Sequence, residues 1–148
     1  MGYPMRNRWL VVAGVLSAAA AILHIAVMVG GPDWYRFFGA GEGMARAAER
    51  GSWVPVLITL GIAAVLAIWS AYAFSGAGLI RRVPLIRTGL VTISAIYLAR
   101  GLILFPTLVL KPQLLDAFAV WSSLIVLAYG VAYAVGTWRG WAVLSKAD

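Results

Sequence analysis

Four long apolar stretches, which occupy most of the chain, constrain this sequence more than any other feature. They are residues 9–29, 54–74, 85–110 and 117–137, and a longer connection at 30–53 separates the first two. Each stretch reaches the roughly 20 residues that an α-helix needs to cross about 30 Å of hydrocarbon. The sequence therefore predicts an all-α integral membrane protein. We expect one domain over residues 1–148, an up-down bundle of four transmembrane helices.

The composition supports a membrane location and excludes some chemistry. Hydrophobic residues make up 63% and charged residues 11% of the chain, whereas a soluble domain has about 25% charged residues. The chain has no cysteine, which excludes disulfides, thiolate catalysis and cysteine-ligated zinc or iron–sulfur clusters. The first apolar stretch continues through Val29 and is too long for a cleaved secretory signal, so we expect it to be retained as a membrane helix.

The placement of charges predicts the orientation in the membrane. Seven basic residues lie in the N-terminal tail, the middle connection and the C-terminal tail, namely Arg6, Arg8, Arg81, Arg82, Arg87, Arg139 and Lys146. The other two connections hold four, namely Arg36, Arg46, Arg50 and Lys111, and these are balanced by Asp33, Glu42, Glu49 and Asp116. The positive-inside rule therefore places both termini in the cytoplasm and the long connection at 30–53 outside.

The net charge of +7 has the same explanation. The excess of basic residues is confined to short segments beside the membrane helices, where it suits anionic lipid headgroups. No nucleic-acid-binding motif accompanies it, so membrane lipid is an expected partner and nucleic acid is not.

Capping and proline residues predict where the helices begin and end. Ser52 can cap the second helix, and Pro55 suits its first turn, where no backbone N–H is needed. Pro84 is expected to open the third helix and Pro106 to kink it, since a proline cannot donate to the carbonyl four residues earlier. The turn that begins at Lys111 is short, which predicts that the third and fourth helices are antiparallel neighbours.

Arg100 lies within a run, Gly89 to Leu110, that is otherwise almost wholly apolar. An arginine near the bilayer centre costs at least about 2.5–3.5 kcal/mol, so such residues usually face a bundle interior, a wet cavity or a partner. Steps of three and four residues place Tyr97 and Thr107 on the face of Arg100, and we expect this face to be buried. All five acidic residues lie outside the apolar stretches. The counterion of Arg100 is therefore an outer-loop acid, a bound anion or another protein.

An outward-facing polar pocket is predicted around Arg100. At about 1.5 Å per residue, Arg100 lies about 15 Å and His24 about 8 Å below the outer boundary, a gap that an arginine side chain can close. Ser123 on the fourth helix lies in the same outer half. The residues expected to bind a ligand are Arg100, His24, Tyr97, Glu42, Thr59, Trp69, Trp121 and Ser122.

Two interpretations of the outer connection at 30–53 stay open. In the first, it forms an interfacial helix whose charges are solvated or paired with one another, as the four-residue spacing of Glu42 and Arg46 allows. In the second, it is a lid that brings Glu42 over the pocket toward Arg100 and His24. Connections of this length are usually functional or disordered, and this one is too aromatic for disorder.

The sequence does not identify catalytic residues, although His24 and Glu42 are candidates. Imidazole changes charge near neutral pH, which makes His24 the natural group for proton transfer. With one histidine and no cysteine, a protein metal site is not expected. The glycine-rich segment Gly39 to Gly43 lacks the strand and the lysine of a nucleotide-binding loop. No cofactor is assigned.

The segment Gly30 to Glu42, which reads GGPDWYRFFGAGE, carries a resemblance. Through it the whole chain resembles small bacterial inner-membrane proteins of unassigned activity, and the helix count is similar to that of DoxX-like membrane proteins. The resemblance implies a bacterial inner-membrane location and no particular reaction.

Three classes of function follow from these residues. The first is the binding of a lipid, quinone-like or other amphiphilic small molecule in the outward-facing pocket, with or without enzymatic activity. The second is an accessory or scaffolding subunit of a membrane complex, in which Arg100 pairs with a carboxylate of the partner. The third is a small transporter or channel subunit that works as a homo-oligomer.

Overall fold

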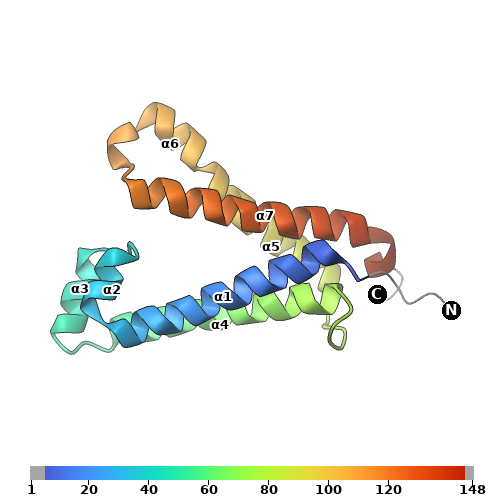
Figure 1. Cartoon of the computed structure of the whole chain (residues 1–148), viewed down its shortest axis with the longest axis horizontal. Helices are drawn as coiled ribbons and strands as arrows, with labels where there is room; N and C mark the ends of the chain where they lie inside the picture. Colours follow the sequence, from blue (N-terminus) through green and yellow to red (C-terminus); the bar gives the residue numbers. More distant parts are fainter. Residues whose placement is uncertain (1–5, 146–148) are drawn as a thin grey trace. The chain divides into compact units, whose positions relative to one another are not determined.

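The fold is described from a computed structural model, which covers residues 6–145. Lys146, counted above among the basic residues, lies outside this range. The helices are α1 (Arg8–Gly30), α2 (Pro32–Phe37), α3 (Glu42–Glu49), α4 (Val54–Gly76), α5 (Ile86–Leu102), α6 (Leu104–Leu110) and α7 (Ala117–Leu144), with a 3-10 turn η1 (Pro112–Leu114) before α7 (Figure 1). Residues 6–145 contain no strand.

Four helical segments are long and apolar enough to cross a membrane. They are Arg8–Gly30, Val54–Gly76, Ile86–Leu110 and Ala117–Leu144. The predicted all-α fold with four membrane helices is thereby confirmed, and the protein is a multi-pass membrane protein.

The described chain forms two compact units. Unit 1 is drawn from Met1–Ser17 and Trp69–Asp148, and unit 2 is Ala18–Ile68. The single domain over the whole chain stays a prediction.

Unit 1 brings together parts of all four membrane helices around small residues. Leu10 of α1 is fully buried. A Cβ added at Gly76 of α4 would lie 2.8 Å from its Cδ1 atom, and one added at Gly136 of α7 would lie 3.0 Å from its backbone nitrogen. The Gly76 position also meets Leu90 of α5, at 2.9 Å. Leu10 therefore fills the place where α1, α4 and α7 approach closely.

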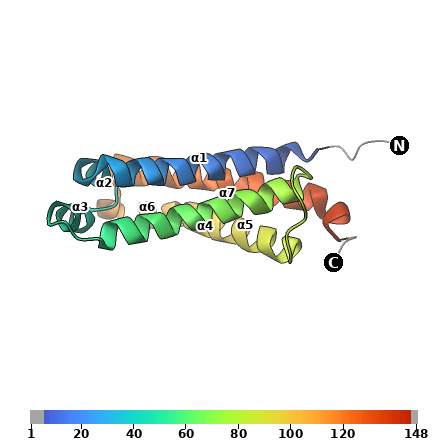
Figure 2. The same cartoon turned by 90° about the horizontal axis from the view of Figure 1, so that it is seen from below.

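Helices α5 and α7 pack along each other in opposite directions, as Figure 2 shows. A Cβ added at Gly101 would lie 2.7 Å from the Leu127 Cα atom, and one added at Gly130 would lie 2.8 Å from the Leu98 backbone nitrogen. Each helix thus offers a glycine to a leucine of the other. The prediction that the third and fourth membrane helices are antiparallel neighbours is confirmed.

The helix ends follow the expected chemistry, except at the start of α5 and at the end of α7. The Ser52 hydroxyl accepts a hydrogen bond from the Val54 backbone nitrogen at 3.3 Å, at the start of α4. Helix α5 begins at Ile86, because Leu85 adopts a left-handed conformation with φ of 52° and so separates Pro84 from the helix. The third span breaks at Ile103, between α5 and α6. This break is the predicted kink, since Pro106 has no N–H for the carbonyl four residues earlier.

Helix α7 is longer than predicted at its C-terminal end, where it continues to Leu144. The apolar run stops at residue 137, but a helix can extend beyond the hydrocarbon because its backbone hydrogen bonds do not depend on apolar side chains. At its other end, the Asp116 carboxylate accepts a hydrogen bond from the Ala119 backbone nitrogen at 2.7 Å. This cap fixes the first turn of α7 next to η1.

Candidate functional site

Arg100 lies on α5 with its side chain exposed and directed to α7. One guanidinium nitrogen, Nη1, donates to the Ser123 hydroxyl at 3.1 Å. The face predicted to be buried also includes Ile93 and Leu104. Ile93, Tyr97 and Leu104 are buried and Thr107 is half-buried, whereas Arg100 is exposed. The prediction was wrong for Arg100 because the neighbouring Gly101 occupies the close contact with α7. Arg100 therefore lies at the edge of the α5–α7 contact.

The α7 residues predicted around Arg100 have different roles. Ser123 is buried and accepts the arginine hydrogen bond. The Ser122 hydroxyl donates to the Ala119 carbonyl of its own helix at 3.2 Å. Trp121 is 66% exposed. The Arg100–Ser123 pair is thus a charged donor group held by one neutral hydroxyl on the surface of unit 1.

A buried hydrogen-bonded chain of hydroxyl groups lies one helical turn before Arg100. The Ser17 hydroxyl lies 3.1 Å from the Tyr97 hydroxyl and 2.8 Å from the Tyr133 hydroxyl. The Tyr133 hydroxyl donates to the Trp69 carbonyl at 2.9 Å. Because each hydroxyl has one proton, Ser17 must donate to Tyr133 and must accept from Tyr97. These hydrogen bonds therefore all point the same way: Tyr97 donates to Ser17, Ser17 donates to Tyr133, and Tyr133 donates to the backbone carbonyl of Trp69.

The aromatic rings of this cluster pack on Tyr97. Its ring centroid lies 4.9 Å from that of Trp69 and 5.5 Å from those of Tyr129 and Tyr133. Tyr97 and Trp69, both predicted to bind a ligand, are therefore engaged in packing within unit 1. Sequence reasoning missed Ser17, Tyr129 and Tyr133. The four-residue spacing of the two tyrosines, which places them on one face of α7, was the available signal.

Unit 2 contains three other predicted site residues, His24, Thr59 and Glu42, and each of them has a hydrogen-bond partner. His24 is half-buried, and its Nδ1 atom lies 2.7 Å from the Ala20 carbonyl oxygen. Since a carbonyl only accepts, Nδ1 donates this hydrogen bond. The Thr59 hydroxyl donates to the Tyr35 hydroxyl at 3.3 Å, and Tyr35 is 2% exposed. Within residues 6–145, no three potential metal-ligating side chains gather into a site.

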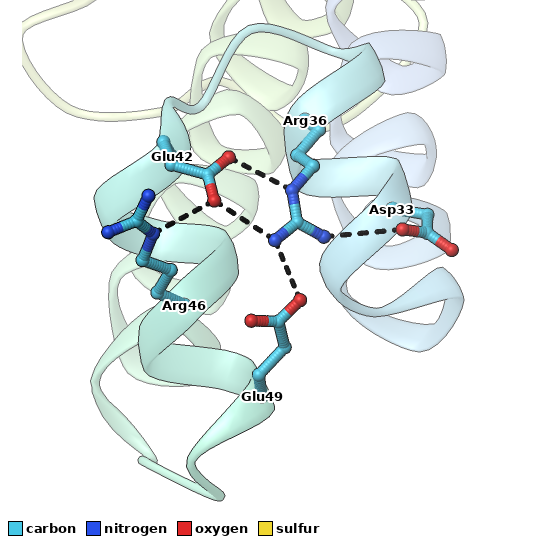
Figure 3. A network of polar contacts seen from close by, with 5 residues as sticks. All are labelled: Asp33, Arg36, Glu42, Arg46 and Glu49. Carbon is cyan, nitrogen blue, oxygen red and sulfur yellow. Dashed lines mark hydrogen bonds and ion pairs between the residues drawn. The ribbon is translucent and has the colours of Figure 1, made fainter.

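The third, Glu42, belongs to a network of ion pairs on α2 and α3 (Figure 3). Its carboxylate lies 2.9 Å from Arg36 Nε and 3.0 Å from Arg46 Nε. Arg36 also pairs with Glu49 at 2.6 Å and with Asp33 at 3.3 Å. These ion pairs agree with the first interpretation of the connection, an interfacial helix whose charges are paired with one another. The lid interpretation stays a prediction, and it requires these pairs to break.

The network predicts that acid weakens the contact between α2 and α3. Hydrogen bonds from Arg36 and then from Arg46 lower the Glu42 pKa from 4.5 to about 2, and the carboxylates in turn raise the Arg36 pKa. A carboxyl group whose pKa is lower in the folded state stabilises the fold at every pH above its pKa in the unfolded chain. This stabilisation is lost as the pH falls through its pKa in the folded state. The protection factors of the amides in α2 and α3, which correct for the slower intrinsic exchange in acid, should therefore fall between pH 4.5 and 2.

Glu42→Gln is the control for this titration. The variant should exchange faster than the wild type at neutral pH, and the difference should shrink as the pH approaches 2, where the wild-type carboxylate is itself protonated. A difference that is unchanged over this range would assign the effect to something other than the ionised carboxylate.

The chain was also compared with known proteins. Its sequence matches no protein-family model, no curated protein and no solved structure.

Proposed function

We propose that this multi-pass protein lies in the inner membrane with both termini in the cytoplasm and binds an amphiphilic small molecule at Arg100. The class includes lipids and quinone-like molecules whose head carries a carboxylate, a phosphate or a carbonyl oxygen. The observation that supports the proposal is an exposed guanidinium in the third membrane span, held by one neutral hydroxyl. Such a group is costly in hydrocarbon unless an acceptor covers it.

The donor geometry favours an oxygen-rich head. A guanidinium has five N–H donors in a planar fork, and the bond to Ser123 uses one nitrogen. No ion pair joins Arg100 to a carboxylate among residues 6–145. The remaining donors suit two acceptor oxygens on one ligand, as in carboxylates and phosphates.

The surroundings of Arg100 suit the apolar part of such a ligand. Ile96 and Ile103 lie four residues before and three residues after Arg100, on the same face of the helix, and both are exposed. On α7, Trp121 and Leu124 are exposed in the same part of the sequence as Ser123. An acyl or isoprenoid tail could lie along these side chains while its head meets the arginine.

The second candidate, an accessory subunit whose partner supplies a carboxylate, is favoured by the same exposed arginine. The small residues at 101, 130 and 136 already contact leucines within unit 1, so they do not offer a free seam to another helix. The partner would have to bind through Arg100 and the apolar surface. The transporter or channel alternative has no observation of its own, and roles for His24, Thr59 and Glu42 at this site stay predictions.

Arg100→Gln should remove the bound amphiphile. A hydrogen bond to a charged group contributes about 1.5–3 kcal/mol, so the amount that co-purifies in native mass spectra after mild extraction should fall about tenfold or more. Arg100→Lys should retain part of it, because a point charge replaces the fork. Arg46→Gln, which removes an arginine from the outer loop, is the control.

The outcomes separate the two candidates. Equal amounts of bound amphiphile in the wild type and in Arg100→Gln would contradict the ligand proposal. A protein that co-purifies with the wild type and is lost from Arg100→Gln would favour the accessory subunit.

A further inference from the structure

Unit 1 gathers basic residues at the end where α1 begins, α4 joins α5, and α7 stops. We call this the basic end, and its residues are Arg6, Arg8, Arg81, Arg82, Arg87 and Arg139. Asp116, at the opposite end of α7, is the one acidic residue that the structure describes in this unit. Among the described residues of unit 1, the basic end therefore carries positive charge with no acidic residue to balance it.

Backbone and side-chain contacts hold these segments together. The Asn7 side-chain amide donates to the Gly136 carbonyl at 2.7 Å, which fixes the start of α1 against the last turns of α7. The Ser75 hydroxyl donates to the Arg81 carbonyl at 3.1 Å and accepts from the Val83 nitrogen at 3.0 Å, which fixes the α4–α5 connection. The arginines are thus presented by a fixed backbone.

Two of the arginines have structural contacts within the unit. Arg82 donates to the Leu144 carbonyl at the C-terminal end of α7, where a positive charge is favourable. The Arg87 guanidinium lies 4.5 Å from the centroid of the Trp141 ring. The other four arginines, Arg6, Arg8, Arg81 and Arg139, are exposed, and no ion pair joins them to an acid among residues 6–145. Their charge is available to a ligand.

Tryptophans next to two of these arginines indicate their depth. Trp9 follows Arg8 on α1, and Trp138, which is 77% exposed, precedes Arg139 on α7. Exposed tryptophans favour the boundary between hydrocarbon and headgroups. Because Asn7 contacts Gly136, the two arginine–tryptophan steps lie at the same end of neighbouring helices. We therefore expect both guanidiniums to lie near the level of the lipid phosphates.

We propose that the basic end is a binding site for anionic phospholipid headgroups, in which Arg8 of α1 and Arg139 of α7 bind the phosphate from two helices. Arg81 adds a third charge from the α4–α5 connection. Arginine–phosphate contacts are charge-assisted hydrogen bonds, which are stronger than neutral ones. Each basic residue near an anionic surface changes affinity by about fivefold. The site is separate from Arg100 and does not depend on the ligand proposed there.

The test is a lipid-exchange titration of the whole protein, followed by native mass spectrometry with phosphatidylglycerol and with phosphatidylcholine. The wild type should retain phosphatidylglycerol preferentially, and raised salt should weaken the preference. The double variant Arg8→Gln/Arg139→Gln should lose about tenfold or more of this preference. Arg50→Gln/Lys111→Gln removes the same charge from the outer connections and should keep it.

Three results would overturn the proposal. They are equal retention of the two lipids by the wild type, an unchanged preference in Arg8→Gln/Arg139→Gln, and an equal loss in the control double variant. Inorganic phosphate that displaces phosphatidylglycerol, where chloride of equal ionic strength does not, would assign the site to free phosphate. Arg100→Gln should leave the preference intact, so failure of the two proposals can be told apart.

Discussion

Gly101→Val is expected to disrupt the packing of α5 on α7. The Cβ atom alone would lie 2.7 Å from the Leu127 Cα atom and 2.8 Å from its backbone nitrogen. Backbone atoms cannot rotate away as a side chain can, so the two helices must separate. Overpacking of this kind costs about 1–3 kcal/mol or more. The midpoint of thermal unfolding in detergent should fall by about 5 °C or more.

Gly61→Val is the matched control, since it places the same side chain in a membrane helix. A Cβ added at Gly61 of α4 meets nothing within 4 Å. Its unfolding midpoint should therefore stay close to that of the wild type. The prediction would be contradicted if both valine variants unfolded at the same temperature.

Tyr35→Ala is expected to release α2 and α3 from the rest of unit 2. Tyr35 forms a buried cluster with Val27 and Ala45, and its hydroxyl accepts from Thr59. Truncation of a buried aromatic side chain to alanine costs about 3–5 kcal/mol. Amide hydrogen exchange in α2 and α3 should rise by at least about a hundredfold. Tyr35→Phe, which removes only the hydroxyl, should have a smaller effect.

Phe37→Ala provides the control on the same short helix. Phe37 is 76% exposed, so its removal leaves the buried cluster intact. Exchange in α2 and α3 should change little. Equal exchange in Phe37→Ala and Tyr35→Ala would show that α2 is not anchored through Tyr35.

The sequence predicted the four membrane helices because a long apolar run leaves an α-helix as the simplest way to satisfy the backbone in lipid. The residues that mark helix breaks and helix ends predicted the positions of these boundaries less accurately. Pro106 predicted a kink, but the observed break lies at Ile103, since the proline affects the turn before it. Arg139 ended the apolar run, although α7 continues through it to Leu144.

The candidate site was predicted only in part for a different reason. Depth along the helices placed Arg100 and Ser123 at comparable levels, and the two are hydrogen-bonded. Spacing within one helix does not specify which neighbouring helix it faces, so the bonds from Ser17 to Tyr97 and Tyr133 were not predicted. The two interpretations of the connection at 30–53 did not predict that Tyr35 is buried, because an aromatic residue in a loop looks the same in sequence whether it is exposed or buried.

The ion pairs of α2 and α3 also have a consequence for biosynthesis. They join residues that are three to thirteen positions apart, so all of their partners have been synthesised once Glu49 is complete. Loops of this size close in well under a millisecond. Once it has left the ribosome, the connection between the first two membrane helices can therefore neutralise its own charges without any contact from α5.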